Sequence, residues 1–172
     1  LDGTRQRTYV LMGDGEIAEG SVWESVEVAS HAGVDNLCAT VDVNRLGQSS
    51  PTMLQHDMKT HKARWKAFGW HAIVVDGHDV AALVAAYAEA AATKGKPTVI
   101  LAKTLKGKGL PGENQNGYHG KPVASGEVEQ VLKTLEGKLS GSKKAWKPNL
   151  PAKAAKAKAS KPRKMSAPPY AL

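Results

Sequence analysis

Short apolar runs alternate with helix-length segments along this chain, and that alternation constrains the fold more than any other feature. The apolar runs that read as strands cover residues 8–12, 36–43, 70–75 and 98–102, and the first of them is expected to be a short buried strand. Helical patterns with glycine or proline stops follow at residues 20–33, 53–68, 80–93 and 127–139. Strands that alternate with helices predict right-handed crossovers and a parallel sheet flanked by helices. The sequence therefore predicts an α/β fold, with Asp79 as the N-cap of its third helix.

The positive charge of the chain is concentrated at its C-terminal end. The 172 residues have a formal net charge of +8, yet ten Lys or Arg and no Asp or Glu lie within 138–172. Residues 1–137 therefore keep 14 of the 24 basic residues against all 16 acidic ones, a net charge of −2. Lys, Ala, Pro and Ser dominate after residue 139. We expect residues 1–139 to form part of one domain and 140–172 to be a flexible linker or tail.

Several classes of protein do not fit this composition. No apolar run approaches the roughly 20 residues that cross a bilayer, so no membrane association is expected. Cys38 is the single cysteine and lies in an apolar run, which indicates a buried thiol and a reducing, cytoplasmic setting. The basic tail would suit a nucleic-acid-associated protein. That alternative is disfavoured, because the folded part is net acidic and the tail interleaves few aromatic residues.

Polar residues stand directly after three of the predicted strands. These are Asp14, Asn44 and Lys103, and the carboxyl ends of parallel strands face one crevice, where ligands gather. Asp14 and Asn44 offer the hard oxygen ligands that Mg²⁺ prefers, with phosphate oxygens filling out its shell. Gly13 and Gly15 would let a diphosphate approach the backbone without meeting a Cβ. The structural alternative is a plain glycine turn with an unrelated asparagine.

Longer motifs identify a family. The GDG of residues 13–15 is separated by 28 residues from Asn44, which resembles the thiamine diphosphate motif. GDGEIAEGSVWESVEVAS, NRLGQS, AFGWHAIVVDGHD, KTLKGKG and HGKP together are similar to transketolases, nearly continuously over residues 5–125. The resemblance implies an incomplete thiamine diphosphate-binding fold, the N-terminal domain of such an enzyme.

The resemblance also implies roles for individual residues. Asp14 and Asn44 would bind Mg²⁺ through their side chains and Leu46 through its backbone carbonyl, with Ca²⁺ able to replace Mg²⁺. Gly13, Gly15 and Asn44 would contact the diphosphate. Lys103 and His119 match positions that line the cofactor and the substrate channel, and His119 would be the catalytic residue on this chain. Glu19 and Glu24 match acidic residues at a dimer interface.

The implied reaction is transfer of a two-carbon ketol unit from a ketose phosphate to an aldose phosphate. The resemblance also implies sugar phosphate substrates and a homodimer with active sites at the subunit interface. This chain would supply the half that anchors Mg²⁺ and diphosphate, and alone it should be inactive, because no pyrimidine-binding domain follows. The alternatives are another thiamine diphosphate enzyme, such as a sugar-phosphate synthase or phosphoketolase, and a non-catalytic interaction module.

Overall fold

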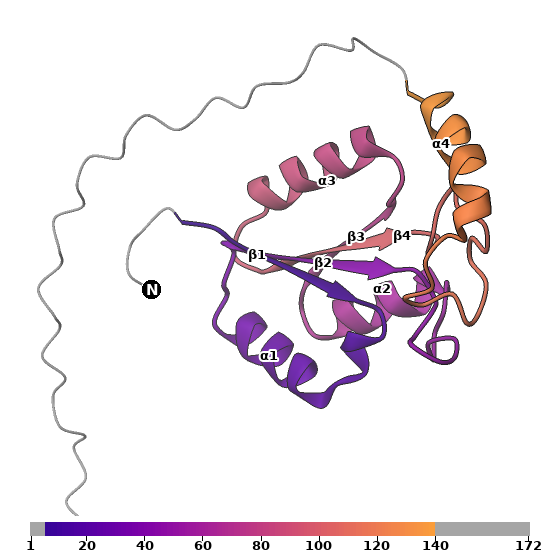
Figure 1. Ribbon diagram of the computed structural model, residues 1–172. Coiled ribbons are helices and arrows are strands. Elements are labelled where there is room, and N and C mark those ends of the chain that lie inside the picture. The colour runs from indigo at the N-terminus through magenta and orange to yellow at the C-terminus, as the bar shows by residue number, and fades with distance from the viewer. Residues whose placement is uncertain (1–5, 140–172) are drawn as a thin grey trace, which may run out of the picture. The chain divides into compact units, whose positions relative to one another are not determined.

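Four parallel strands form one sheet in a computed structural model that describes residues 6–139 (Figure 1). In spatial order they are β1 (Thr8–Gly13), β2 (Leu37–Val43), β4 (Thr98–Lys103) and β3 (His71–Asp76). All three neighbouring pairs are parallel, as the alternating sequence predicts. The linker or tail predicted at residues 140–172 lies outside the described residues.

Helices cover both faces of the sheet. α1 (Gly20–His31) and α2 (Met58–Ala67) lie on one face, and α3 (Val80–Ala92) lies on the other (Figure 1). The chain moves outward from β1 to β2 to β3, and α1 and α2 lie on its two outward connections. β4 then inserts between β2 and β3, so the connection through α3 runs backward. A right-handed crossover in the reversed direction requires the opposite face, which accounts for the position of α3.

Each face of the sheet has its own apolar core. The larger one, under α1 and α2, includes Val41, Leu101 and the fully buried Trp65. The ring of Trp65 lies 5.3 Å from that of Trp23 and 5.0 Å from that of Trp70, measured between centroids. The smaller core, under α3, consists of Cys38, Ala86, Ala90 and Ile100. The predicted buried thiol is therefore confirmed, and its burial raises the pKa of Cys38.

The strand at residues 8–12 forms as predicted, but the prediction that it is buried is wrong. β1 occupies an edge of the described sheet, and Tyr9 and Leu11 are 58% and 75% exposed. The ring of Tyr9 lies 6.0 Å from the ring of Tyr87 on α3, measured between centroids. Beyond that contact, no helix of residues 6–139 covers the face of β1 that carries Tyr9 and Leu11. The apolar side chains of this face are therefore exposed in the described part of the chain.

Helix boundaries differ from the predicted ones where a polar residue caps the backbone. The helix expected from residue 53 begins at Met58, because Asp57 accepts a hydrogen bond from the Thr60 amide. A short 3₁₀ turn, η1 (Glu16–Ala18), precedes α1. A second one, η2 (Ser125–Glu127), leads into α4 (Val128–Glu136). None of the helices within residues 6–139 is long and apolar enough to cross a lipid bilayer.

Candidate metal and diphosphate site

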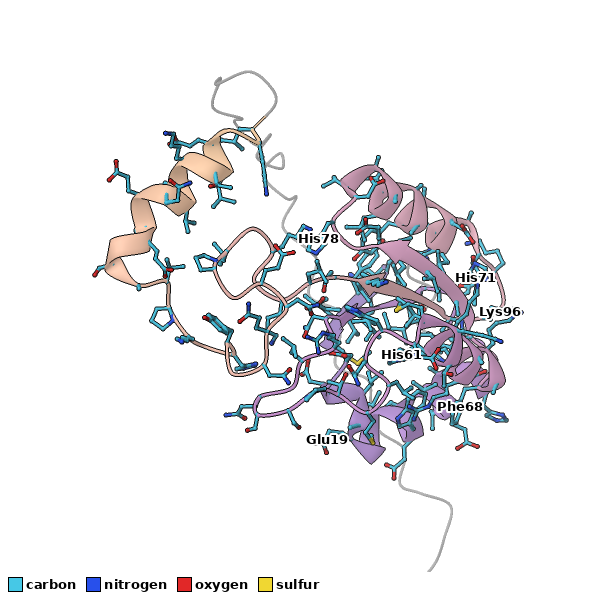
Figure 2. All side chains as sticks on the ribbon, turned by 90° about the vertical axis from the view of Figure 1, so that its right-hand side faces the viewer. Glu19, His61, Phe68, His71, His78 and Lys96 are labelled. Carbon is cyan, nitrogen blue, oxygen red and sulfur yellow. The ribbon has the colours of Figure 1, made fainter. Side chains whose placement is uncertain are left out.

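Three neighbouring strands end at the same edge of the sheet, and this edge faces the viewer in Figure 2. Gly13 pairs with Asp42 and Val43 pairs with Lys103, so Asp14, Asn44 and Lys103 stand on adjacent strand ends. The convergence predicted from the sequence is confirmed for the backbone. The side chains of Asp14 and Lys103, however, line two different hollows. Asp14 lines a hollow of about 210 Å³ with Thr52 and His61, whereas Lys103 lines another with His78 and Lys108.

The carboxylate of Asp14 is held by one of its two oxygens. Its Oδ2 accepts a hydrogen bond from the Arg45 amide at 3.1 Å and one from the Thr52 hydroxyl at 2.6 Å. Its Oδ1 is buried and has no hydrogen-bond partner among residues 6–139. Buried carboxylate oxygens normally have a hydrogen-bond partner, so this oxygen is a candidate ligand for a cation.

Asn44 follows β2 and is also buried. Its Nδ2 donates to Asp42 Oδ2 at 3.0 Å, and its Oδ1 accepts from the Leu46 amide at 3.1 Å. The Thr104 hydroxyl donates to Asp42 Oδ1, which fixes Asp42 in turn. The amide of Asn44 therefore has one defined orientation, with a second lone pair of Oδ1 still available. Over the described part of the chain, no hydrogen bond ends on the Leu46 carbonyl.

This donor set suits a hard cation that completes its shell from a ligand. Within residues 6–139, no three His, Cys, Asp or Glu side chains are placed to hold a metal ion by themselves. The free Asp14 oxygen, the Asn44 amide oxygen and the Leu46 carbonyl are all oxygen donors, with a single negative charge. Mg²⁺ takes one or two carboxylates and fills its octahedron with waters and phosphates. The residues present therefore fit Mg²⁺ with a diphosphate.

The two glycines that flank Asp14 leave room at this corner. Gly15 has φ −70°, a conformation open to any residue, so its backbone does not require glycine. A Cβ placed there would lie 3.9 Å from the Thr52 methyl group, at ordinary contact distance. The Gly13 amide donates to Glu16 Oε2 at 2.6 Å. Nothing inside the described chain explains glycine at position 15, which favours an approach by a ligand.

His119 does not lie with the residues above. It is exposed on the long loop that follows β4, and its Nδ1 lies 2.9 Å from Lys106 Nζ. Glu19 and Glu24 are exposed and form no ion pair among residues 6–139 (Figure 2 labels Glu19). His61 is buried beside this corner and lines the same hollow as Asp14. Its burial lowers its pKa, while the Gln55 carbonyl and the Asp14 carboxylate act in the opposite direction.

The sequence did not reveal three of the residues that build this corner. Asp42 stands two positions before Asn44, with Val43 between them. That spacing was a signal in the sequence that could have identified Asp42 as part of the corner. Thr52 and Arg45 reach Asp14 only because an antiparallel bridge between Leu46 and Pro51 folds the loop back. No local pattern announces such a bridge.

Comparison with known proteins decides the family. The family described as "Transketolase, thiamine diphosphate binding domain" matches residues 2–157. The chain belongs to the transketolase family. It is 47% identical over 145 residues to transketolase from Homo sapiens, across 84% of this chain and 23% of that protein. It is 48% identical over 140 residues to transketolase-like protein 2 from Homo sapiens, across 81% and 22%.

Solved transketolases share the fold. The transketolase of Pichia stipitis in complex with sedoheptulose-7-phosphate superposes with a TM-score of 0.67 at 33% identity, over 74% of this chain and 19% of that one. The transketolase of Campylobacter jejuni gives 0.65 at 28% identity, over 77% and 20%. This chain thus corresponds to part of a transketolase's thiamine diphosphate-binding domain. The predicted family and fold class are confirmed.

Proposed function

We propose that this chain is the part of a transketolase that anchors Mg²⁺ and the diphosphate of thiamine diphosphate. The full protein would transfer a two-carbon ketol unit from a ketose phosphate to an aldose phosphate. The observation that supports this most is the Asp14 carboxylate, with one oxygen held by two hydrogen bonds and the other buried and free. Such an arrangement presents one oxygen in a fixed direction, as a metal ligand requires.

Each residue of the corner then has a defined task. Asp14 Oδ1, Asn44 Oδ1 and the Leu46 carbonyl would hold Mg²⁺, and Ca²⁺ could take its place because it accepts the same ligands. Gly13 and Gly15 would admit the diphosphate, and Asn44 would contact it as well. When bound, thiamine diphosphate supplies the carbon nucleophile and the electron sink of ketol transfer. The protein's own contribution at this corner is binding and orientation.

Lys103 and His119 would act toward the substrate side. Lys103 ends β4 with an exposed ammonium group that can meet phosphate or developing negative charge. His119 is exposed, so it can donate a hydrogen bond to a substrate hydroxyl or carbonyl or move a proton near neutral pH. We propose His119 as the catalytic residue of this chain.

We further propose that the chain does not catalyse ketol transfer alone. It spans 23% of the length of its human transketolase relative, so most of that enzyme has no counterpart here. The same proposal predicts a homodimer with active sites at the subunit interface and with Glu19 and Glu24 at that interface. It also predicts a cytoplasmic setting. Sugar phosphates are the expected substrates, and a related solved structure carries sedoheptulose-7-phosphate.

The other functions considered have less support. The matching family and the curated relatives are transketolases, which disfavours a sugar-phosphate synthase or a phosphoketolase. A role in nucleic-acid binding would rest on residues 140–172, which lie outside the described part of the chain. A non-catalytic interaction module would not need the free buried oxygen of Asp14.

Ligand-dependent thermal stability tests the proposal. Thiamine diphosphate with Mg²⁺ or Ca²⁺ should raise the melting temperature of the 172-residue chain, and thiamine diphosphate with EDTA should not. Asp14→Asn should abolish the shift. Its amide oxygen must accept from Arg45 and Thr52, which places the NH₂ group where the cation would bind. The control is Asp76→Asn, which changes a carboxylate at the end of β3 that accepts from the His78 amide.

Two results would reject the proposal. An unchanged ligand shift in Asp14→Asn would remove the metal role of this carboxylate. No shift in the unaltered chain at millimolar ligand would remove the anchoring function. Ketol transfer by the purified chain would contradict only the prediction that it is inactive alone.

A further inference from the structure

The loop that carries His119 is long and rich in glycine. It runs from Thr104 to Ala124 between β4 and η2, and we call it the 104–124 loop. Its left-handed glycines are Gly107, Gly109, Gly112, Gly117 and Gly120. Glycine-rich backbone loses much entropy when it is ordered, so such a loop needs an anchor to hold one conformation.

Arg45 provides that anchor. Its Nε donates to Asn114 Oδ1 at 2.7 Å, and its Nη2 donates to the Asn114 carbonyl, so the guanidinium grips one residue at two points. Asn114 has φ +58°, and its amide donates to the Lys106 carbonyl at 2.9 Å across the base of the loop. Lys106 Nζ in turn contacts His119 Nδ1 at 2.9 Å. The grip of Arg45 is thus two contacts away from His119.

No other hydrogen bond of the described residues anchors the part of the loop after residue 105 to an earlier part of the chain. The start of the loop is fixed, because Thr104 bonds to Val43 and Asp42 and the Leu105 amide donates to His78. From residue 106 to residue 124, every other hydrogen bond found within residues 6–139 stays inside the loop or joins it to η2. Among the hydrogen bonds of residues 6–139, only those from Arg45, which follows β2, join that stretch to a part of the chain that precedes the loop.

The other end of Arg45 is built into the metal corner. Its backbone is left-handed, with φ +64°, which is uncommon for a residue other than glycine. Its amide donates to Asp14 Oδ2 at 3.1 Å, and its carbonyl accepts from the Thr52 amide at 2.9 Å. The main chain of Arg45 therefore orients Asp14, while its side chain holds the loop.

We propose that Arg45 is a positioning residue that fastens the 104–124 loop, and His119 with it, to the Asp14 corner. Its relevance to ketol transfer rests on the function proposed above, but the grip itself does not. Arginine suits the task because its planar fork donates in two directions at once. Lysine would keep the charge and lose the fork.

Hydrogen–deuterium exchange of the 172-residue chain without cofactor tests this inference. The reporters are the amides of Leu110, Glu113 and Asn114, which are all bonded inside the loop. Arg45→Ala should speed their exchange by about tenfold or more, because hydrogen bonds to a charged group are lost. Exchange in β2 and β4 should not change. Arg45→Lys should fall between Arg45→Ala and the unaltered chain.

Two glycine variants of the same loop provide the matched comparison. Asn114→Gly keeps the left-handed backbone and removes the side-chain acceptor, so it should speed exchange in part. Asn116→Gly changes an exposed asparagine two residues away and should have no such effect on the reporters. Combining Arg45→Ala with Asn114→Gly should add nothing to Arg45→Ala alone, since both remove one grip.

The inference fails if loop exchange in Arg45→Ala stays within twofold of the unaltered chain. It also fails if exchange rises equally in β2 and β4, because Arg45 would then only stabilise the fold. Should Arg45→Ala not fold, the same criteria apply to Arg45→Lys. A loop loosened in a chain that shows no thiamine diphosphate shift would sustain the grip and reject the function proposed above.

Discussion

In the proposed site, the orientation of the Asn44 amide would decide whether the corner can hold a cation. Asn44 Nδ2 donates to Asp42 Oδ2 and Asn44 Oδ1 accepts from the Leu46 amide, so the amide has one orientation, and the proposed site uses its Oδ1 as a metal ligand. An amide turned by 180° would put two N–H groups where a cation needs an oxygen. Asp42 would therefore control the proposed site although it is not itself proposed as a ligand.

Removing the Asp42 carboxylate should weaken metal binding without unfolding the chain. Asp42→Ala should lower the affinity for Mg²⁺ in the presence of thiamine diphosphate by about ten- to hundredfold, as for other residues that orient a metal ligand. Isothermal titration calorimetry measures this directly. Asp76→Ala is the control, because it removes a strand-end carboxylate that does not touch Asn44. Equal affinities in both variants would show that Asn44 is oriented without Asp42.

His61 makes a second residue-scale prediction, concerning pH. Its burial lowers its pKa, so the unfolded chain takes up a proton near the ordinary value of 6.5 while the folded chain does not. Between these two pKa values the unfolded state binds more protons, and stability therefore rises with pH. The contribution of His61 is fully present above about pH 6.5 and is lost as the pH falls below it.

Urea unfolding at pH 7.5 and 5.5 measures this effect. The free energy of unfolding should be lower at pH 5.5 than at pH 7.5. His61→Gln should reduce this decrease, because Gln does not titrate. His31→Gln, at the exposed end of α1, should leave the fall unchanged. A fall of the same size in His61→Gln and in the unaltered chain would exclude His61 as its source.

Sequence reasoning was sufficient for residues whose position follows from one strand end. Asp14 and Asn44 each close an apolar run, so both could be placed at the carboxyl edge of a parallel sheet. Arg45 and Asn114 are 69 residues apart, and their contact depends on how two loops fold over that edge. Local patterns carry no information about such a contact, which is why the sequence did not predict it.

Among the elements, α3 was the helix most fully predicted. Asp79 caps it as expected, with its Oδ1 accepting from the Ala82 amide at 3.0 Å. The start of α2 differs from the predicted one because Asp57, inside the predicted range, also caps a helix. Apolar and helix-forming residues continue on both sides of Asp57, so the pattern gives no reason to start there. Caps decide boundaries, and periodicity only shows that a helix exists.

The cap of α3 yields an element-scale prediction. Asp79→Ala should lower the free energy of unfolding by about 1 kcal/mol, since a bare helix N-terminus leaves an amide unsatisfied. Asp79→Ser should recover most of the loss, because a serine hydroxyl can accept the same hydrogen bond. Urea denaturation of both variants gives the comparison. If serine is no better than alanine, the effect comes from charge rather than from capping.

At the scale of the whole molecule, the strands of the described sheet differ in how far neighbouring strands and helices cover them. β2 and β4 are central strands with strands on both sides and helices on both faces, as a parallel sheet requires. β1 has the apolar composition of a buried strand, yet Leu11 is 75% exposed. Composition reports what a strand is suited to, and coverage depends on what packs against it.

The same substitution at an open and a covered leucine should therefore have very different effects. Leu101→Thr places a hydroxyl in the core and should reduce the free energy of unfolding by about 2 kcal/mol or more. Leu11→Thr keeps a good strand former at an exposed position and should stay within about 0.5 kcal/mol of the unaltered chain. Both are measured by urea denaturation of the 172-residue chain at several concentrations. A large loss in Leu11→Thr would mean that β1 is covered in solution, and if that loss grew with protein concentration, the cover would be a second copy of the chain.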